Sequence, residues 1–204
     1  MKQRIDIKDG KTGLYFTSDF HLFHTNVLRF DKRPYKDVFE MHEDIVEKWN
    51  DMIDKNDVVY YIGDLSFAKA HEMREVERII NELNGKIHFI MGNHDDFGGI
   101  RKLNRFESVN DYVDLKVTHK LNGKEEETHV CLFHYPIYSW NKGHHGSLHL
   151  HGHCHGNLHH GEDASYYDNR RVMDVGCMLT DYYPISFSEV YNKLMQVEIK
   201  KLER

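Results

Sequence analysis

The sequence predicts an α/β fold, because strand-like and helix-like apolar patterns alternate along its first half. Residues 14–17, 58–62 and 87–91 are short apolar runs rich in aromatic or β-branched side chains, as in buried strands. Residues 40–54 and 70–83 lie between them and carry apolar side chains at helical spacing. Each run ends in polar residues. Because strands that alternate with helices end along one rim of a sheet, we expect these polar residues to lie together.

Each predicted helix has one apolar face and one polar face. The apolar stripes are Met41, Ile45, Trp49, Met52 and Ile53 in the first helix and Met73, Val76, Ile80 and Leu83 in the second. We interpret both stripes as core. Asn84 and Gly85 end the second helix, because glycine readily adopts the left-handed conformation that terminates helices.

The pattern changes in the second half of the chain. Residues 112–117 alternate with period two, Asn122 and Gly123 form a strong hairpin signal, and residues 128–133 return as a strand. The segment therefore predicts an antiparallel pair, in contrast to the alternation before it.

The rest of the chain completes one domain. Further strands are expected at residues 148–150 and 171–175, followed after Pro184 by a helix and a strand. Residues 24–35 are expected to be a polar loop, and a short irregular or helical piece precedes residue 107. No internal repeat or linker divides the sequence, so residues 1–204 are predicted to be a single domain.

Composition narrows the classes of protein that are possible. Hydrophobic residues make up 40% and aromatic residues 12%, which excludes a disordered chain. With 33 acidic and 27 basic residues the net charge is -6, so no basic surface for extended nucleic-acid binding is expected. The three cysteines form no disulfide framework, and the sequence has neither a signal peptide nor an apolar run that could span a bilayer. We expect a cytoplasmic protein that has no membrane contact, and its oligomeric state stays open.

Histidine is unusually frequent, with 17 residues, and several histidines stand where predicted strands end. Carboxylates, an amide and imidazoles together form the mixed ligand set that first-row divalent metals accept. The candidate ligands exceed what one tetrahedral ion needs, whereas two ions sharing a carboxylate would use them all. The polar blocks, in chain order, are Asp19-x-His21, Gly63-Asp64, Gly92-Asn93-His94-Asp95, His134 and Gly152-His153-x-His155.

These blocks, complete and in this order, resemble the calcineurin-like metallophosphoesterase superfamily. The resemblance covers roughly residues 14–177, and it is strongest to the small single-domain prokaryotic and phage branch, helped by residues 18–26 and by Arg33-Pro34. It implies a two-layer β sandwich flanked by helices, the four-layer αββα arrangement, with the site at the strand ends.

The resemblance also implies a role for each motif residue. It implies that Asp64 bridges two metal ions. It implies that His94 contacts the scissile phosphate and that Asp95 orients the His94 imidazole. The first ion would be bound by Asp19, His21, Asp64 and His155, and the second by Asp64, Asn93, His134 and His153.

Substrate contacts are expected from Asn93 and His94, and from His24 and Arg33, for which an ordinary solvated loop is an equal alternative. The implied reaction is hydrolysis of a phosphomonoester or phosphodiester, nucleotide-like in kind. A hydroxide held between two divalent ions roughly 3.5–4 Å apart would attack phosphorus. Mn²⁺ is the first expectation for the metal, with Fe, Zn²⁺, Ni²⁺ and Mg²⁺ as alternatives.

Three other interpretations compete with this one. They are a non-catalytic binding module with the same fold, a nuclease acting on polynucleotide, and a histidine-rich metal buffer. The histidines outside the blocks are expected on the surface rather than at the site entrance; they are His144, His145, His149, His151, His159 and His160. A metal count of about two per chain would favour the enzyme over the buffer.

Overall fold

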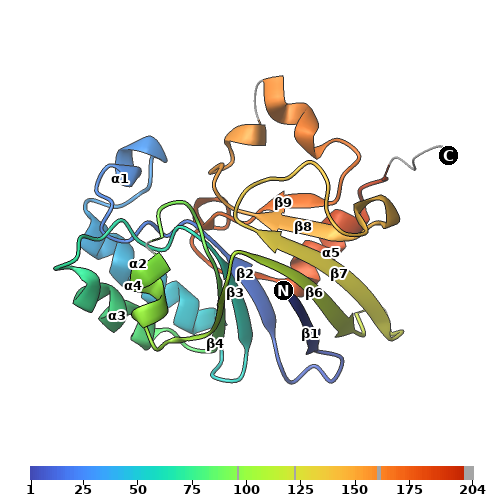
Figure 1. Cartoon of the computed structure of the whole chain (residues 1–204), viewed down its shortest axis with the longest axis horizontal. Coiled ribbons are helices and arrows are strands. Elements are labelled where there is room, and N and C mark those ends of the chain that lie inside the picture. The colour runs from blue at the N-terminus through green and yellow to red at the C-terminus, as the bar shows by residue number, and fades with distance from the viewer. Residues whose placement is uncertain (96, 122, 160–161, 200–204) are drawn as a thin grey trace.

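The described residues form two five-stranded β-sheets with helices beside them, so the predicted α/β class is confirmed (Figure 1). The computed structural model describes residues 1–95, 97–121, 123–159 and 162–199. Both sheets mix parallel and antiparallel pairs.

The first sheet carries the three strands predicted from the apolar runs. Its order is β10-β2-β3-β4-β5, in which β2 to β5 run parallel and β10 is antiparallel to β2. The strands are β2 Leu14–Thr17, β3 Val58–Ile62, β4 Lys86–Ile90, β5 Phe106–Asn110 and β10 Ile185–Ser186. Because β2, β3 and β4 are adjacent and parallel, the polar residues that follow them share one rim, as expected.

The second sheet has the order β1-β6-β7-β8-β9, with an antiparallel β6–β7 pair and parallel pairs elsewhere. Its strands are β1 Lys2–Asp6, β6 Tyr112–His119, β7 Glu126–Phe133, β8 Leu148–His151 and β9 Val172–Asp174. The pairing of β6 with β7 agrees with the predicted hairpin, although Asn122 of its turn signal lies outside the described residues. Strands β1, β5 and β10 were not predicted, since the order expected after Pro184 was a helix and then a strand.

Helices cover the outer face of the first sheet (Figure 1). The two predicted helices are α2 Val38–Met52 and α3 Met73–Glu82. The Asp37 side chain caps α2 by accepting from the backbone N–H groups of Phe39 and Glu40. The shorter helices are α1 Val27–Phe30, α4 Phe97–Lys102 and α5 Phe187–Met195, and the 3-10 turns are η1 Gly143–His145, η2 Asn157–His159, η3 Glu162–Tyr167 and η4 Cys177–Leu179. The loop expected at residues 24–35 therefore contains a helical turn.

Two cores lie on the two faces of β3. Val59 and Tyr61 pack with the helix stripes, whereas Val58, Tyr60 and Ile62 pack against the second sheet. All five side chains are buried, which explains why the β3 sequence is a continuous apolar run. The buried strand ends are thus held rigidly between a helix layer and a second sheet.

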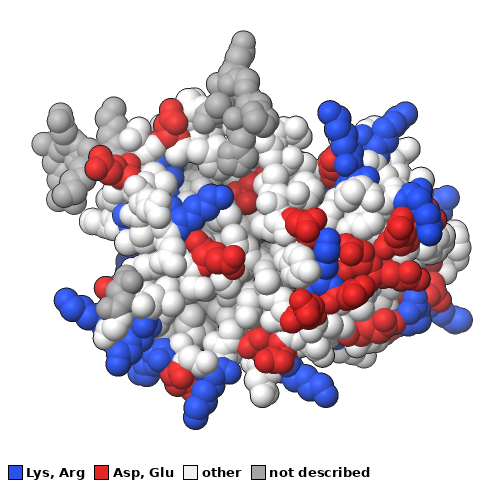
Figure 2. All heavy atoms as spheres, turned by 180° about the vertical axis from the view of Figure 1, so that it is seen from behind, with Lys and Arg blue, Asp and Glu red and all other residues white. Residues whose placement is uncertain are grey.

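Acidic side chains gather over the helical side of the molecule (Figure 2). The exposed faces of α2 and α3 supply many of them, including Glu43, Glu47, Asp51, Glu75, Glu77 and Glu82. This face would repel a polyanion. Among the helices of the described residues, none has both the length and the apolar composition needed to cross a bilayer.

Candidate metal centre

All seven predicted ligands lie together, in segments that follow five strands. Asp19 and His21 follow β2, Asp64 follows β3, and Asn93 follows β4. The second sheet contributes the rest from the segments after β7 and β8, which are His134, His153 and His155. The two sheets meet here, since the His153 N–H donates to the Asp19 carboxylate at 3.1 and 3.2 Å.

The first group of ligand atoms comes from Asp19, His21 and His155. The Nε2 atoms of the two histidines are 3.1 Å apart. Asp19 Oδ1 lies 3.8 Å from Nε2 of His21 and 3.5 Å from Nε2 of His155. Three ligand atoms converging at this spacing can surround one cation. We call these three residues the first cluster.

The second group comes from Asp64, His134 and His153. His134 Nε2 lies 3.4 Å from Asp64 Oδ2. The Asn93 amide oxygen joins them, at 3.1 Å from His134 Nε2 and 2.8 Å from His153 Nδ1. We call these four residues the second cluster.

Asp64 lies between the two clusters. Its Oδ2 atom is 3.4 Å from His134 Nε2 and 3.7 Å from His21 Nε2, so one carboxylate oxygen reaches both groups. This position suits a ligand shared by two ions.

In two of the four histidines, His134 and His155, a hydrogen bond on the far side of the ring fixes which nitrogen faces the centre. His134 Nδ1 lies 2.8 Å from the carbonyl oxygen of Ile62, so it donates and leaves the Nε2 lone pair toward Asp64. His155 Nδ1 lies 2.8 Å from a carboxylate oxygen of Asp31 in the same way. Outward N–H donation that leaves the other nitrogen free is the usual arrangement of metal-binding histidines, so the donor set fits divalent cations.

The centre concentrates negative charge in a buried place. Burial would raise the pKa of Asp64, but the hydrogen bond and attraction from His134 outweigh it and hold the pKa at about 2. Burial would lower the pKa of His155, but its bonds to Asp19 and Asp31 raise it to about 10. For His21 burial dominates and lowers the pKa to about 4, so this imidazole is neutral at neutral pH. The carboxylates that raise the pKa of His155 stabilise positive charge at this place, and a bound cation would supply that charge in exchange for the imidazole proton.

The backbone at the centre is strained. Asp19, His21, Asp64, His153 and His155 all have positive φ, between 48° and 69°. Left-handed conformations cost non-glycine residues about 1–3 kcal/mol each, and they persist where the surrounding structure imposes them. Their concentration on predicted ligands indicates a functional site.

Two glycines let the loops approach this closely. A Cβ on Gly92 would collide with the carboxylate and backbone N of Asp64, and one on Gly152 would collide with Asp19 and Ser18. Each glycine thus allows one loop to lie against the carboxylate of another.

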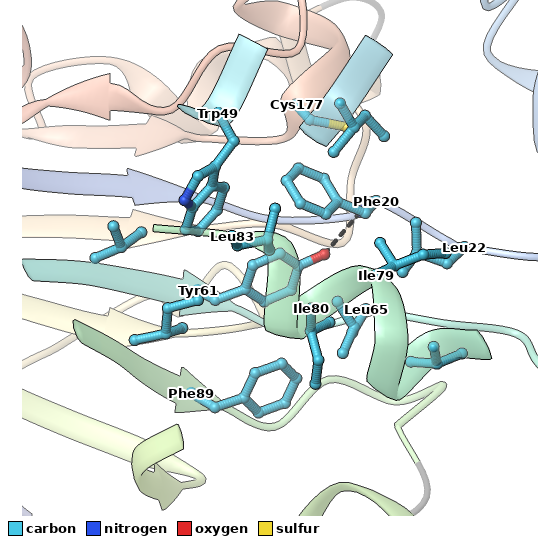
Figure 3. Packing of buried hydrophobic residues seen from close by; sticks show 14 of the residues in the cluster. Phe20, Leu22, Trp49, Tyr61, Leu65, Ile79, Ile80, Leu83, Phe89 and Cys177 are labelled. Atoms are coloured by element: carbon cyan, nitrogen blue, oxygen red, sulfur yellow. Dashed lines mark hydrogen bonds between the residues drawn. The ribbon is translucent and has the colours of Figure 1, made fainter. Parts of the chain in front are cut away.

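A core residue anchors the first motif. Phe20 lies between two ligands, and its ring is buried among Trp49, Tyr61 and Leu22 (Figure 3). Its N–H donates to the Tyr61 hydroxyl at 2.9 Å, the dashed line of Figure 3. The apolar core therefore fixes the peptide from which Asp19 and His21 project.

Arg33 has a different role from the one expected. Its side chain is fully buried, and its guanidinium donates to the carbonyl oxygens of Phe20 at 2.8 Å and Asp19 at 2.9 Å. It also donates to Asp31 Oδ2 from Nε at 3.0 Å and from Nη2 at 2.8 Å. The expected substrate contact is therefore wrong. Arg33 and Asp31 form a clip that ties the Asp19 segment to His155, and no motif marked Asp31 in the sequence.

Asp95 also differs from expectation. Its carboxylate accepts from the backbone N–H groups of Gly92 at 2.7 Å, Asp64 at 2.8 Å and Leu65 at 2.9 Å. The expectation that it orients the His94 ring is wrong, because both oxygens hold the backbone of two loops. Burial raises the pKa of Asp95 to about 6 against the opposing effect of these bonds.

The remaining predicted residues lie at the rim of the centre. The exposed His94 ring is 5.5 Å from the ring of His21, and its backbone N–H donates to Asp64 Oδ1 at 2.9 Å. The His24 ring is 5.6 Å from the ring of His21 and stacks on Phe67.

Two of the extra histidines are not on the surface. His149 and His151 of β8 are completely buried, and His151 bonds to the Gly152 carbonyl at 2.7 Å and to the Tyr167 hydroxyl at 3.1 Å. The surface prediction is wrong for both, because alternating β8 side chains are covered by the η3 turn and the segment after β7. His144 and His145 are exposed as expected. His160 and the side chain of His159 lie outside the described residues.

Asp174 is a second supporting residue without a sequence signal. It is buried at the end of β9 and accepts from the N–H groups of Gly156 and Gly176, each at 2.9 Å. Burial raises its pKa to about 7. It thereby holds the loop that follows His155.

Comparison with known proteins identifies relatives along most of the chain. The uncharacterized protein MJ1445 of Methanocaldococcus jannaschii is 30% identical over 173 residues, covering 85% of this chain and 86% of that protein. The chain belongs to the same family as MJ1445. The Gene 66 protein of Mycobacterium phage L5 is 27% identical over 186 residues, and the match covers 79% of this chain and 84% of the phage protein. No family model matches the chain.

A solved structure has a similar fold. The crystal structure of a protein of unknown function, AQ665 from Aquifex aeolicus, superposes with a TM-score of 0.66 at 23% sequence identity. The match covers 90% of this chain and all of that one. The likeness concerns the arrangement of the sheets and helices, and the chemistry must be argued from the site itself.

Proposed function

We propose that this protein is a dinuclear metal-dependent phosphoesterase of the calcineurin-like metallophosphoesterase superfamily, with the αββα fold of that superfamily, and that it acts in the cytoplasm. One observation carries the proposal. Ligand-type side chains from segments after five strands converge as two adjoining clusters, and the Asp64 carboxylate reaches both. Packing alone explains neither the convergence nor the left-handed backbone at five of these residues.

The first cluster with Asp64 would hold one ion, and the second cluster the other. Divalent ions at such positions activate water and neutralise phosphate oxygens, and Mn²⁺ is the metal that we propose first. The substrate that suits this chemistry is a phosphomonoester or a phosphodiester.

The reaction is a hydrolysis. The oxygen of a water molecule adds to phosphorus, the ester P–O bond breaks, and the departing oxygen takes up a proton. His94 is the residue that we assign to that proton, since its ring is exposed at the rim and its backbone is fixed to Asp64. The Asn93 amide, also exposed, would bind both an ion and the phosphate.

The test replaces the shared carboxylate. Asp64→Ala should lower bound Mn²⁺ from about two per chain to well below one, and it should abolish hydrolysis of aryl phosphate monoesters and diesters. Asp44→Ala is the control, because Asp44 pairs with Lys48 and Tyr35 away from the clusters. Metal content is measured by mass spectrometry of dialysed protein, and folding by circular dichroism. Unchanged turnover in folded Asp64→Ala protein would refute the bridging role.

The same measurements separate the rival functions. A binding module would hold metal and hydrolyse no ester of a panel that includes cyclic nucleotides and oligonucleotides. A histidine-rich buffer would bind many ions weakly instead of about two. A nuclease would prefer the oligonucleotides.

A further inference from the structure

We propose that an aromatic rim beside His94, formed by His24, Phe30 and Phe67, binds a planar aromatic group on the ester substituent of the substrate. The inference rests on the proposed function and names the class of its substrate: phosphate esters that carry a nucleobase or another aromatic ring. Hydrolysis of the ester bond does not require these three rings, so their arrangement indicates what else the substrate carries.

The three rings form a connected surface that reaches the centre. Phe67 stacks on His24 with ring centroids 4.5 Å apart and an interplanar angle of 29°. Phe67 meets His94 edge-on at 5.1 Å and 64°. Phe30 extends the surface outward, 6.3 Å from His24. A group bound at His94 is therefore adjacent to aromatic faces.

Both phenylalanines are unusually open to solvent. Phe67 is 49% exposed and Phe30 is 62% exposed, although apolar rings are normally buried. Exposed apolar surface that adjoins a polar site is typical of ligand binding. Exposure alone does not make a ring part of the rim. Phe39 is 64% exposed, but the rings beside it are those of Phe23 and His42, which are not in the rim.

The Phe67 backbone is held in place before any ligand binds. The Phe67 N–H donates to the Leu22 carbonyl at 2.8 Å, and the Leu22 N–H donates to the Leu65 carbonyl at 2.9 Å. The Ser66 hydroxyl closes the turn by accepting from the Ala68 N–H at 2.9 Å. The loop after β3 is thus joined to the loop after β2, which carries His24. A fixed ring loses little conformational entropy when a ligand stacks on it.

The position beside His94 indicates which part of the substrate the rim receives. If His94 gives a proton to the departing oxygen, the substituent on that oxygen continues past His94 toward Phe67. Aromatic faces bind other aromatic rings by offset stacking, which is indifferent to most ring substituents. A planar aromatic group on the leaving alcohol is the substituent that fits.

The experiment compares substrates that differ only in the aromatic group. A nucleoside 5′-monophosphate and ribose 5-phosphate contain the same type of ester bond, and the second lacks the base. Both are tested as monoesters and as methyl diesters, together with p-nitrophenyl phosphate, in which the ring is attached directly. We expect kcat/KM to be higher with the base by about 5- to 100-fold, the range that base stacking on aromatic side chains supports.

The variants locate this preference on the protein. Phe67→Leu should reduce the preference for the base to less than about threefold, whereas Phe67→Trp should retain the preference. Phe39→Leu is the matched control, since it removes an equally exposed ring outside the rim. Tyr135→Leu tests the opposite side of the centre, where the Tyr135 ring lies 4.6 Å from that of His153.

A binding measurement makes the result independent of turnover. Saturation-transfer NMR on metal-free protein should detect binding of the free nucleoside but not of ribose, with a weaker signal for Phe67→Leu.

Equal kcat/KM with and without the base, or a preference lost in Tyr135→Leu and kept in Phe67→Leu, would overturn the rim. If no ester is hydrolysed, the proposed function fails, and absence of nucleoside binding then also rejects the rim. Preference for p-nitrophenyl phosphate without a base effect would restrict the class to simple aryl esters and contradict a nucleoside substrate.

Discussion

The two clusters of the candidate centre differ in how firmly the protein holds them. In the first cluster Asp19 is fully buried and His21 is 3% exposed, and the clip of Asp31 and Arg33 braces His155 from behind. In the second cluster Asp64 and His134 are also buried, but His153 and Asn93 are exposed, and the Asn93 amide oxygen meets only ring nitrogens of the same cluster among the described residues. The first cluster is thus formed in advance, whereas the second is completed at the surface.

The two clusters should therefore differ in their affinity for metal. Ligands that are already oriented lose less conformational entropy when an ion binds, and supporting residues contribute to affinity. We therefore expect the first cluster to bind its ion more tightly and the second to exchange its ion more readily.

Among variants that keep both metals, the largest effect on turnover is expected at a residue outside both clusters. His94→Ala should slow ester hydrolysis by about 10²- to 10⁴-fold, the usual contribution of general acid catalysis, with two metals still bound. Steady-state kinetics and metal analysis measure the two quantities. The exposed His71 serves as control when replaced by Ala. Loss of either metal in His94→Ala would mean that His94 belongs to a cluster after all.

The clip should matter for one cluster only. Asp31→Asn removes the charge facing His155 and leaves one oxygen where His155 and Arg33 use two, so Mn²⁺ affinity at the tighter site should fall by about 10- to 100-fold. Isothermal titration calorimetry resolves the two binding steps. Asp44→Asn, which breaks a comparable carboxylate pairing elsewhere, should change neither step. Equal weakening of both steps would contradict the difference between the clusters.

Asp95 should contribute to stability more than to chemistry. Asp95→Asn leaves one of the three backbone N–H groups facing an amide NH₂, so the free energy of unfolding should fall by about 1–3 kcal/mol. Urea denaturation followed by circular dichroism measures the loss. An unchanged midpoint, together with a changed pH profile of turnover, would instead restore a direct role toward His94.

His42, which is not a predicted ligand, should contribute to the acid sensitivity of the metal-free protein. Burial lowers the pKa of His42 to about 4, and its Nε2 accepts from the Phe23 N–H at 3.1 Å. Because the unfolded chain has the higher pKa, this contribution to stability is complete above about pH 6.5 and is lost as the pH falls toward 4. Metal-free protein should lose about 1–2 kcal/mol from this residue by pH 5. His42→Gln should flatten the pH dependence of urea denaturation between pH 6.5 and 5, and an unchanged slope would refute the assignment.

Local patterns predicted the elements that the core buries on one or both faces. The runs that became β2, β3 and β4 and the stripes of α2 and α3 were readable because their spacing matches the period of the element. Strand β1 was missed because Lys2–Asp6 alternates with exposed polar residues at a sheet edge, and α1 is only four residues long.

Sequence by itself determined which side chains are available for the centre, because ligand chemistry depends on residue type and each block follows a strand. Only the tertiary structure decided what Arg33, Asp31 and Asp95 do. The same charged groups can face a substrate or brace the backbone, and which occurs depends on burial and on partners distant in the chain. Asp31 is 124 residues from His155, so no local pattern reports their contact.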